Sequence, residues 1–318
     1  MKPNPVLRKL GFSDSDRLAI IHTDDIGMCQ ASVQAFAELY DFGLISSGAV
    51  MTPCPWFLEA ARFAREHPAV DLGIHLTLTC EWSTYRWGPV STRDPASGLV
   101  DSEGYFYRST PQAREHAETA AALREIEAQV DLAVSAGMRP THADTHMGTL
   151  AGERLMPGYV RMTAQRRLPA MLFRWNDGAE RSAHLNPEQA QRAIYFMNLM
   201  EEIGLPLMDN LVGMPLEKPE DRLETAKRLF DGLPAGVTHF ILHPSVDTPE
   251  LRAITPDWRG RVGDYQTFLS PDLRDHVRSI GIQVIGYRDL QGLMPEPEKV
   301  EEGFRAAAAQ GLSTGGRL

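Results

Sequence analysis

Short apolar runs that alternate with longer amphipathic segments constrain the fold of this chain more than any other feature. Eight such runs occur, at residues 18–24, 45–52, 70–79, 140–146, 170–175, 206–211, 237–244 and 282–288. Strand-length runs separated by helix-length segments are typical of βαβ units around a parallel sheet. Continuous apolar runs also suit strands that are covered on both faces. The pattern predicts an α/β fold with about seven to eight mostly parallel strands, and 318 residues are enough for a (β/α) barrel.

The segments between these runs predict helices and two interruptions. Helices are expected at residues 29–42, 55–66, 113–136, 187–203, 218–231 and 270–280. In the clearest of them, Leu123, Ile126 and Val130 share one face and Gly137 is placed to end the helix. Residues 80–112 and 245–269 are expected to be irregular insertions, of the kind that form lids or binding loops. No repeat, linker or step in composition marks a boundary, so we expect one catalytic domain over residues 1–318.

Charge and cysteine content narrow the classes of partner. The chain has 32 Lys and Arg against 42 Asp and Glu, a net charge of −10, which argues against nucleic acid or an anionic membrane surface and favours a small molecule. Cys29, Cys54 and Cys80 are too few and too widely spaced for a disulfide framework. Because neither a leader-like apolar run nor a membrane-length segment is present, we expect a cytoplasmic protein. A homo-oligomer is considered only because symmetric oligomers are common.

Ionisable residues recur where the predicted strands end. The first strand ends in residues 23–25 (Thr-Asp-Asp), the third contains His75, the fourth ends in residues 142–146, the sixth contains Asp209, and the seventh ends at His243. In a (β/α) barrel the carboxyl ends of the strands form one rim, which carries the chemistry. We therefore expect these residues to gather at that rim.

Asp24 and Asp25 are adjacent carboxylates at the end of an apolar strand. Buried carboxylates repel each other unless a cation or a proton lies beside them. Neighbouring side chains on a strand point in different directions, so one aspartate could bind a metal while the other faces a substrate water. For the pair alone, an equally weighted alternative is that Asp25 caps the next helix and Asp24 is solvated.

Three histidines and an aspartate strengthen the interpretation as a metal site. A single histidine such as His75 in an apolar strand is usually a hydrogen-bonded core residue. His142, Asp144 and His146, however, follow the i, i+2, i+4 spacing that places side chains on one face of a strand. Together they favour one carboxylate and two imidazoles around a metal with open positions. The other histidines are expected to be structural or at the surface: His22, His67, His116, His184, His239 and His276.

The order and spacing of five short motifs resemble those of a known family, the YdjC-like (ChbG/HpnK) carbohydrate deacetylases. The motifs are Thr-Asp-Asp-Ile-Gly at 23–27, where the family has Ala-Asp-Asp-Phe-Gly, Gly-Leu-Ile-Ser-Ser at 43–47, Gly-Ile-His-Leu at 73–76, Pro-Thr-His-Ala-Asp-Thr-His at 140–146 and Leu-His-Pro at 242–244. The resemblance covers most of the chain. It implies an irregular (β/α) barrel of the deacetylase type, in agreement with the predicted strands.

The resemblance also implies an activity and roles for individual residues. Asp25, His75 and His146 match the family's ligands for one divalent metal ion, Mg²⁺ or Zn²⁺. Asp24 matches the proposed general base, and His243 matches a histidine assigned to protonating the leaving amine. The implied reaction is removal of the acetyl group from an N-acetylated sugar or oligosaccharide by a metal-activated water.

Further residues are expected around this site on weaker grounds. Asp144 is expected to orient a ligand imidazole, as carboxylates beside metal-bound histidines do. In the aromatic segment 81–87, Trp82, Tyr85 and Trp87 could stack on a sugar and Arg86 could anchor an acidic group, although packing over the barrel mouth explains these aromatics equally well. Other candidate contacts with the substrate, named for position alone, are His142, Arg174, Asn176 and Arg261.

Two other function classes stay open. Gly148 stands where the family usually has a further histidine, which puts an outer contact in doubt but not the three ligands. One alternative is a metal-dependent hydrolase of another bond, such as a phosphoester, because one fold supports many reactions. The sequence shows neither an obvious second metal site nor a Gly-rich phosphate cradle. The other is a non-catalytic carbohydrate-binding barrel, which would have no need of both Asp24 and Asp25.

Overall fold

Seven strands build the centre of the molecule. A computed structural model describes residues 2–175 and 186–309, so the predictions for Asn176 and His184 lie outside the described residues. Within these residues the strands are β1 (Arg17–Ile26), β2 (Ser47–Val50), β3 (Leu72–Leu76), β4 (Ala143–Thr145), β5 (Asn210–Gly213), β6 (Gly236–Leu242) and β7 (Gln283–Val284).

Helices occupy most of the connections. They are α1 (Pro5–Lys9), α2 (Gln30–Phe42), α3 (Phe57–Glu66), α4 (Thr110–His116), α5 (Thr119–Ser135), α6 (Met156–Gln165), α8 (Pro187–Ile203), α9 (Arg222–Asp231), α10 (Pro249–Ile254), α11 (Trp258–Phe268), α12 (Pro271–Ser279), α13 (Tyr287–Gln291) and α14 (Pro297–Ala309), with short 3₁₀ helices η1 (Pro95–Ser97) and η2 (His146–Ala151). Among the described residues, none of these helices combines the length and apolar character needed to cross a membrane.

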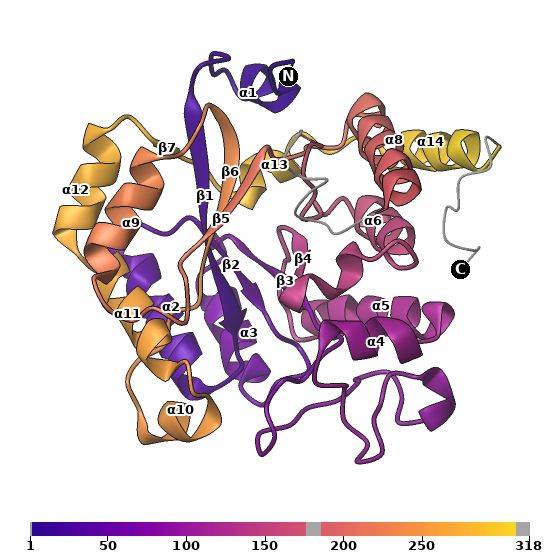
Figure 1. The fold of residues 1–318 in the computed structure, drawn as a ribbon, viewed down its shortest axis with the longest axis horizontal. Coiled ribbons are helices and arrows are strands. Elements are labelled where there is room, and N and C mark those ends of the chain that lie inside the picture. The colour runs from indigo at the N-terminus through magenta and orange to yellow at the C-terminus, as the bar shows by residue number, and fades with distance from the viewer. Residues whose placement is uncertain (1, 176–185, 310–318) are drawn as a thin grey trace.

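The strands form one curled parallel sheet in the order β4-β3-β2-β1-β6-β5. β1 is the central strand: it pairs with β6 along Arg17–Thr23 and with β2 from His22 onward, while β7 lies beside its first residues. The helices surround this sheet (Figure 1). The arrangement confirms the predicted α/β class and the irregular (β/α) barrel, with a curled half-barrel of six strands as its frame.

The predicted strand at 170–175 is wrong. The backbone N–H of Leu172 bonds to the carbonyl of Ala170, and this tight turn takes the segment out of a regular ladder. Two isolated parallel pairs remain, Ala170 with Ala143 and Phe173 with Met208. The segment therefore bridges the gap between β4 and the chain before β5 without forming a strand.

Two other expectations need correction. The helix predicted at 113–136 is two helices, because Ala117 and Glu118 are extended and separate α4 from α5. The insertion 245–269 is not irregular, since it contains α10 and α11. Pro249 opens α10 after Thr248, whose side chain accepts a hydrogen bond from the Leu251 N–H, so this proline starts a helix. The insertion 80–112 is irregular apart from η1 and the first turn of α4.

Apolar packing closes one end of the barrel. A small cluster of Val6, Leu7, Leu18, Val237 and Tyr287 joins α1 to the first residues of β1 and β6. The main core lies between the sheet and the surrounding helices. With the amino ends of the strands covered in this way, the polar residues at the carboxyl ends face the loops and α11.

Candidate metal and active site

A break in the pairing of β1 directs the two adjacent aspartates. The register between β1 and β2 shifts between Thr23 and Ile26, and Asp25 has a φ of 61°. A left-handed aspartate at a strand irregularity is a strained conformation typical of functional sites. Gly27 follows with a φ of 87°, close against the backbone of Phe57. The N-cap of α2 is Cys29, so the alternative in which Asp25 caps this helix is wrong.

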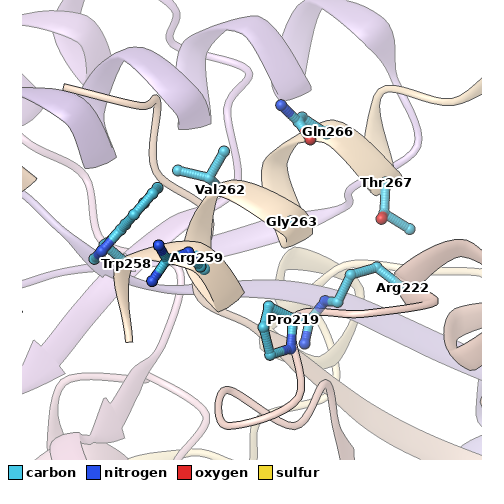
Figure 2. A pocket seen from close by; sticks show the side chains of 8 residues that line it. All are labelled: Pro219, Arg222, Trp258, Arg259, Val262, Gly263, Gln266 and Thr267. Atoms are coloured by element: carbon cyan, nitrogen blue, oxygen red, sulfur yellow. The ribbon is translucent and has the colours of Figure 1, made fainter. Parts of the chain in front are cut away.

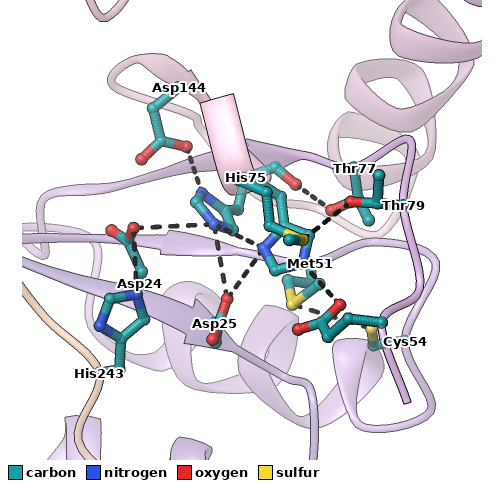
Figure 3. A network of polar contacts seen from close by, with 12 residues as sticks. Asp24, Asp25, Met51, Cys54, His75, Thr77, Thr79, Asp144 and His243 are labelled. Carbon is teal, nitrogen blue, oxygen red and sulfur yellow. Dashed lines mark hydrogen bonds and ion pairs between the residues drawn. The ribbon is translucent and has the colours of Figure 1, made fainter. Parts of the chain in front are cut away.

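His75 is held by its neighbour on the next strand. The β3–β4 register places His75 opposite Asp144, and His75 Nδ1 lies 2.7 Å from Asp144 Oδ1. This contact leaves His75 Nε2 facing Asp25 Oδ1 at 3.5 Å. Figure 3 shows both contacts, together with those of Asp24.

His146 approaches the same carboxylate from the start of η2. Its Nδ1 lies 3.2 Å from Asp25 Oδ1 and 3.2 Å from His75 Nε2, while its Nε2 lies 3.1 Å from Glu81 Oε2. Gly148, two residues on, has a φ of 63°. This is the left-handed region that favours glycine, and the adjacent Met147 adopts it as well, with a φ of 51°.

The donor set of Asp25, His75 and His146 fits a metal ion. A tetrahedral ion with bonds of about 2.0–2.1 Å separates its ligand atoms by roughly 3.3–3.4 Å, close to the three distances between these atoms. Each imidazole is held through its other nitrogen by a carboxylate, the usual support of metal-bound histidines. Asp25 Oδ1 is buried and accepts no hydrogen bond, as expected of an atom reserved for an ion.

Charges around Asp25 keep it ionised. Burial opposes the charged form, but Arg261 Nη1 lies 2.7 Å from Asp25 Oδ2, and this cation and the two histidines hold the pKa of Asp25 well below its usual value. Burial also opposes the charge of His146, yet Glu81 and Asp25 raise the pKa of His146 to about 9. In the absence of a metal, His146 therefore keeps a proton at the place where a cation would bind.

Asp24 and His243 form a pair at the edge of this group. Asp24 Oδ2 lies 3.7 Å from His243 Nε2 and 3.8 Å from His75 Nε2. Burial raises the pKa of Asp24 to about 8 and lowers the pKa of His243 to about 4. The His243 side chain is 22% exposed, against 10% or less for the others, so this group meets solvent mainly at His243.

Two arginines expected to contact substrate are paired inside the protein. Arg86 binds Asp101 and Glu103 within its own loop, which occupies its guanidinium. Arg174 pairs with Asp209, and Asp209 Oδ2 accepts the N–H of Val237 at the second residue of β6. Asp209 and Arg174 therefore lie at the amino end of the barrel, and the expectation that Asp209 points to the carboxyl rim is wrong.

The remaining predicted contacts are also largely internal. Trp82 is 9% exposed and covers the Arg261 guanidinium at 5.7 Å, so Arg261 supports Asp25 instead of meeting solvent. Trp87 donates from its indole N–H to the Thr79 carbonyl. These contacts favour the packing explanation of the aromatic segment. His142 is fully buried and stacks on Tyr287 at 3.8 Å, deeper than the site.

Sequence reasoning missed three residues at this site. Glu81 was considered only as part of the aromatic segment, and no local pattern indicates its contact with His146. His22 and His239 were expected to be structural or at the surface, but both are fully buried beside the aspartates. Strand alternation could have indicated them, because His22 shares a face with Asp24 and His239 with His243.

A separate surface pocket of about 270 Å³ is lined by α11 together with Pro219 and Arg222 at the start of α9 (Figure 2). None of the predicted site residues lines it. Arg222 in its wall bonds to Asp264, whose other oxygen accepts the backbone N–H of His243. The pocket thus borders the packing that positions the His243 backbone, not the aspartates and histidines themselves.

Comparisons with known proteins find relatives that are named carbohydrate deacetylases. The chain is 31% identical over 274 residues to a carbohydrate deacetylase of Thermus thermophilus, covering 85% of this chain and 92% of the relative. It is 25% identical to a carbohydrate deacetylase of Thermoanaerobacter pseudethanolicus, covering 86% and 98%. A crystal structure from Enterococcus faecalis V583, of a protein proposed to cleave cellobiose phosphate, shares the fold at a TM-score of 0.71 and 23% identity, covering 87% and 99%.

The family expected from the motifs is confirmed. The model of the YdjC-like protein family matches residues 18–279. That range starts with β1 and ends with α12, so it contains every element that supplies Asp24, Asp25, His75, His146 and His243. The chain belongs to the YdjC-like family.

Proposed function

We propose that this chain is a metal-dependent carbohydrate deacetylase that hydrolyses the acetamide group of an N-acetylated sugar or oligosaccharide. The observation that carries the proposal is the Asp24–His243 pair, which lies directly beside a three-residue group fit to hold a divalent cation. The carbohydrate deacetylase names of the relatives support the substrate class.

Asp25, His75 and His146 would hold the cation. Such an ion would lower the pKa of a bound water toward about 7 and would polarise the acyl oxygen of the substrate. Two imidazoles and one carboxylate suit Zn²⁺ or a similar transition ion better than Mg²⁺, which prefers oxygen ligands. Asp144 and Glu81 fix the two imidazoles, and Arg261 keeps Asp25 ionised.

Asp24 and His243 would move the proton. Burial raises the pKa of Asp24 to about 8, but the positive charge of a cation held beside it would favour the ionised carboxylate. Asp24 Oδ2 would then take a proton from water as the water adds to the acyl carbon. His243 is neutral near pH 7 because burial lowers its pKa to about 4, so its Nε2, 3.7 Å away, can accept that proton and pass it to the departing nitrogen. The carbon–nitrogen bond then breaks to release a neutral amine and acetic acid, which loses its proton to solvent to give acetate.

The decisive experiment is acetate release from a panel of N-acetylated mono- and oligosaccharides. The protein is stripped of metal and reloaded with Zn²⁺, Mg²⁺, Mn²⁺ or Co²⁺. Metal-dependent release that disappears in Asp24→Asn supports the proposal. A panel of phosphorylated sugars run alongside tests the phosphoester alternative, and binding of a sugar without any release would favour a non-catalytic barrel.

A further inference from the structure

A second cluster of buried histidine and aspartate side chains lies deeper in the barrel than the first. His22 and Asp24 come from β1, Asp144 from β4 and His239 from β6. None is more than 7% exposed. One ligand atom from each lies within 4.8 Å of the others, and none of the four belongs to the group of Asp25, His75 and His146.

Two of the distances inside this cluster are close to those around a metal ion, and the other ligand atoms, those of His239 included, lie within 4.8 Å of one another. His22 Nε2 lies 3.0 Å from Asp144 Oδ2 and 3.3 Å from Asp24 Oδ1. These separations are close to the roughly 3.3–3.4 Å between ligand atoms of a tetrahedral ion. Three strands converge on one point, so the cluster is fixed by the sheet itself.

Two atoms of the cluster are buried without any hydrogen-bond partner. They are Asp24 Oδ1 and His239 Nε2. A buried carboxylate oxygen or imidazole nitrogen left unpaired is costly, and an ion in the space between the side chains would account for both. His239 Nδ1 lies 3.2 Å from the Tyr287 hydroxyl, which fixes the ring and leaves Nε2 for the cluster.

We propose that His22, Asp24, Asp144 and His239 form a second cation site, four-coordinate and closed to solvent, for a divalent transition metal such as Zn²⁺. Two imidazole nitrogens and two carboxylate oxygens select such an ion over Mg²⁺ or Ca²⁺. Four protein ligands around one ion are typical of structural zinc sites.

The second site is joined to the first through two carboxylates. Asp144 Oδ1 holds His75 while its Oδ2 belongs to the second site. Asp24 Oδ1 belongs to the second site while its Oδ2 faces His75 and His243. A cation here would fix the direction of Asp24. That consequence rests on the proposed function of Asp24, whereas binding of the second cation does not.

The test counts Zn²⁺ ions per chain. Full-length protein is stripped with a chelator, reloaded with Zn²⁺ alone, freed of excess metal and analysed by mass spectrometry of the elements, with circular dichroism to establish folding. Wild type is expected to bind two ions, and His239→Gln one. His142→Gln is the matched control, because His142 is an equally buried histidine whose ring centre lies 5.0 Å from that of His22 but belongs to neither group. It is expected to keep two ions.

The outcomes separate this proposal from the proposed function. One ion in wild type, unchanged in His239→Gln, overturns the second site, as do two ions in both proteins. If His239→Gln does not fold, His22→Asn takes its place with the same expectation of one ion. His75→Gln is expected to remove the other ion and leave one. Failure of acetate release with two ions bound counts against the deacetylase proposal alone.

Discussion

Replacing Arg261 with methionine should destabilise the metal-free protein much more than the metal-loaded protein. Arg261 and Asp25 are 3% and 2% exposed, and their closest atoms are 2.7 Å apart. At an effective dielectric constant of about 20, two unit charges at this distance attract by about 6 kcal/mol, part of which desolvation offsets. Removing one member of a buried pair typically costs about 3–5 kcal/mol, because the other charge remains uncompensated.

Binding of a cation to Asp25 should reduce the loss of stability caused by Arg261→Met. With Zn²⁺ bound, Asp25 is neutralised from its other oxygen, so the loss should fall well below the metal-free value. The thermodynamic cycle then requires Arg261→Met to bind Zn²⁺ more tightly by the difference between the two losses.

The assay is thermal unfolding in chelator and in excess Zn²⁺. For a chain of this length a loss of about 3–5 kcal/mol lowers the melting temperature by roughly 4–8 °C. The control is Arg252→Met on α10, which breaks the exposed pair with Asp247 and should leave the melting temperature unchanged. Equal losses with and without Zn²⁺ would refute the assignment of Asp25 as a ligand, and no loss in chelator would refute the buried pair.

Three further predictions concern the proton, the pH and the packing beneath the site. Asp24→Asn should lower acetate release by at least about 10²-fold while at least one Zn²⁺ per chain stays bound, measured on the same sample. In chelator the melting temperature should fall as pH rises from about 6.5 to 9. The folded-state pKa of His146 is raised to about 9, and protonation of His146 stabilises the fold only below that value. Bound Zn²⁺ should make the melting temperature less dependent on pH over this range. Gly73→Ala should cost about 1–3 kcal/mol in urea unfolding, because its Cβ would lie 2.5 Å from the stacked ring of His142, whereas Gly213→Ala, with its nearest atom at 3.7 Å, should not.

The positions of the three residues at the rim could be predicted because each is marked by local sequence, but their choice as the ligand set over Asp24, His142 and Asp144 came from the resemblance to the family. Asp25 follows an apolar run, His75 interrupts one, and His146 ends a run with period-2 spacing. Parallel strands bring such positions to one edge without any knowledge of loop paths. Residues at the carboxyl ends of barrel strands can therefore be predicted from sequence when the apolar run has the same bounds as the strand.

Asp209 shows where that reasoning fails. The apolar run at 206–211 placed it near a strand end, but β5 begins at Asn210, so Asp209 precedes its strand and lies at the opposite end of the barrel. Apolar pattern alone does not distinguish a strand from the buried segment that leads into it. Arg174 was misplaced with it, because the turn at Leu172 breaks the run that was expected to be a strand.

The contacts of Arg261 and Glu81 were not predicted for a different reason. Both belong to the segments between strands, and their partners Asp25 and His146 are 236 and 65 residues away in the chain. Their charges were visible in the sequence, but the pairing depends on how α11 and the loop after β3 fold back over the rim. Contacts of that kind follow from tertiary packing alone.

His22 and His239 are the instructive omissions, because the signal was present. Alternation along β1 puts His22 on the face of Asp24, and alternation along β6 puts His239 on the face of His243. Once Asp24 and His243 are assigned to the barrel interior, the two histidines must point there as well, His22 one layer deeper than Asp24 and His239 two layers deeper than His243. A buried histidine two or four residues before a position at the barrel rim therefore calls for a partner below that rim, and here Asp24 Oδ1 and His239 Nε2 are the buried, unpaired atoms around which we propose the second cation site.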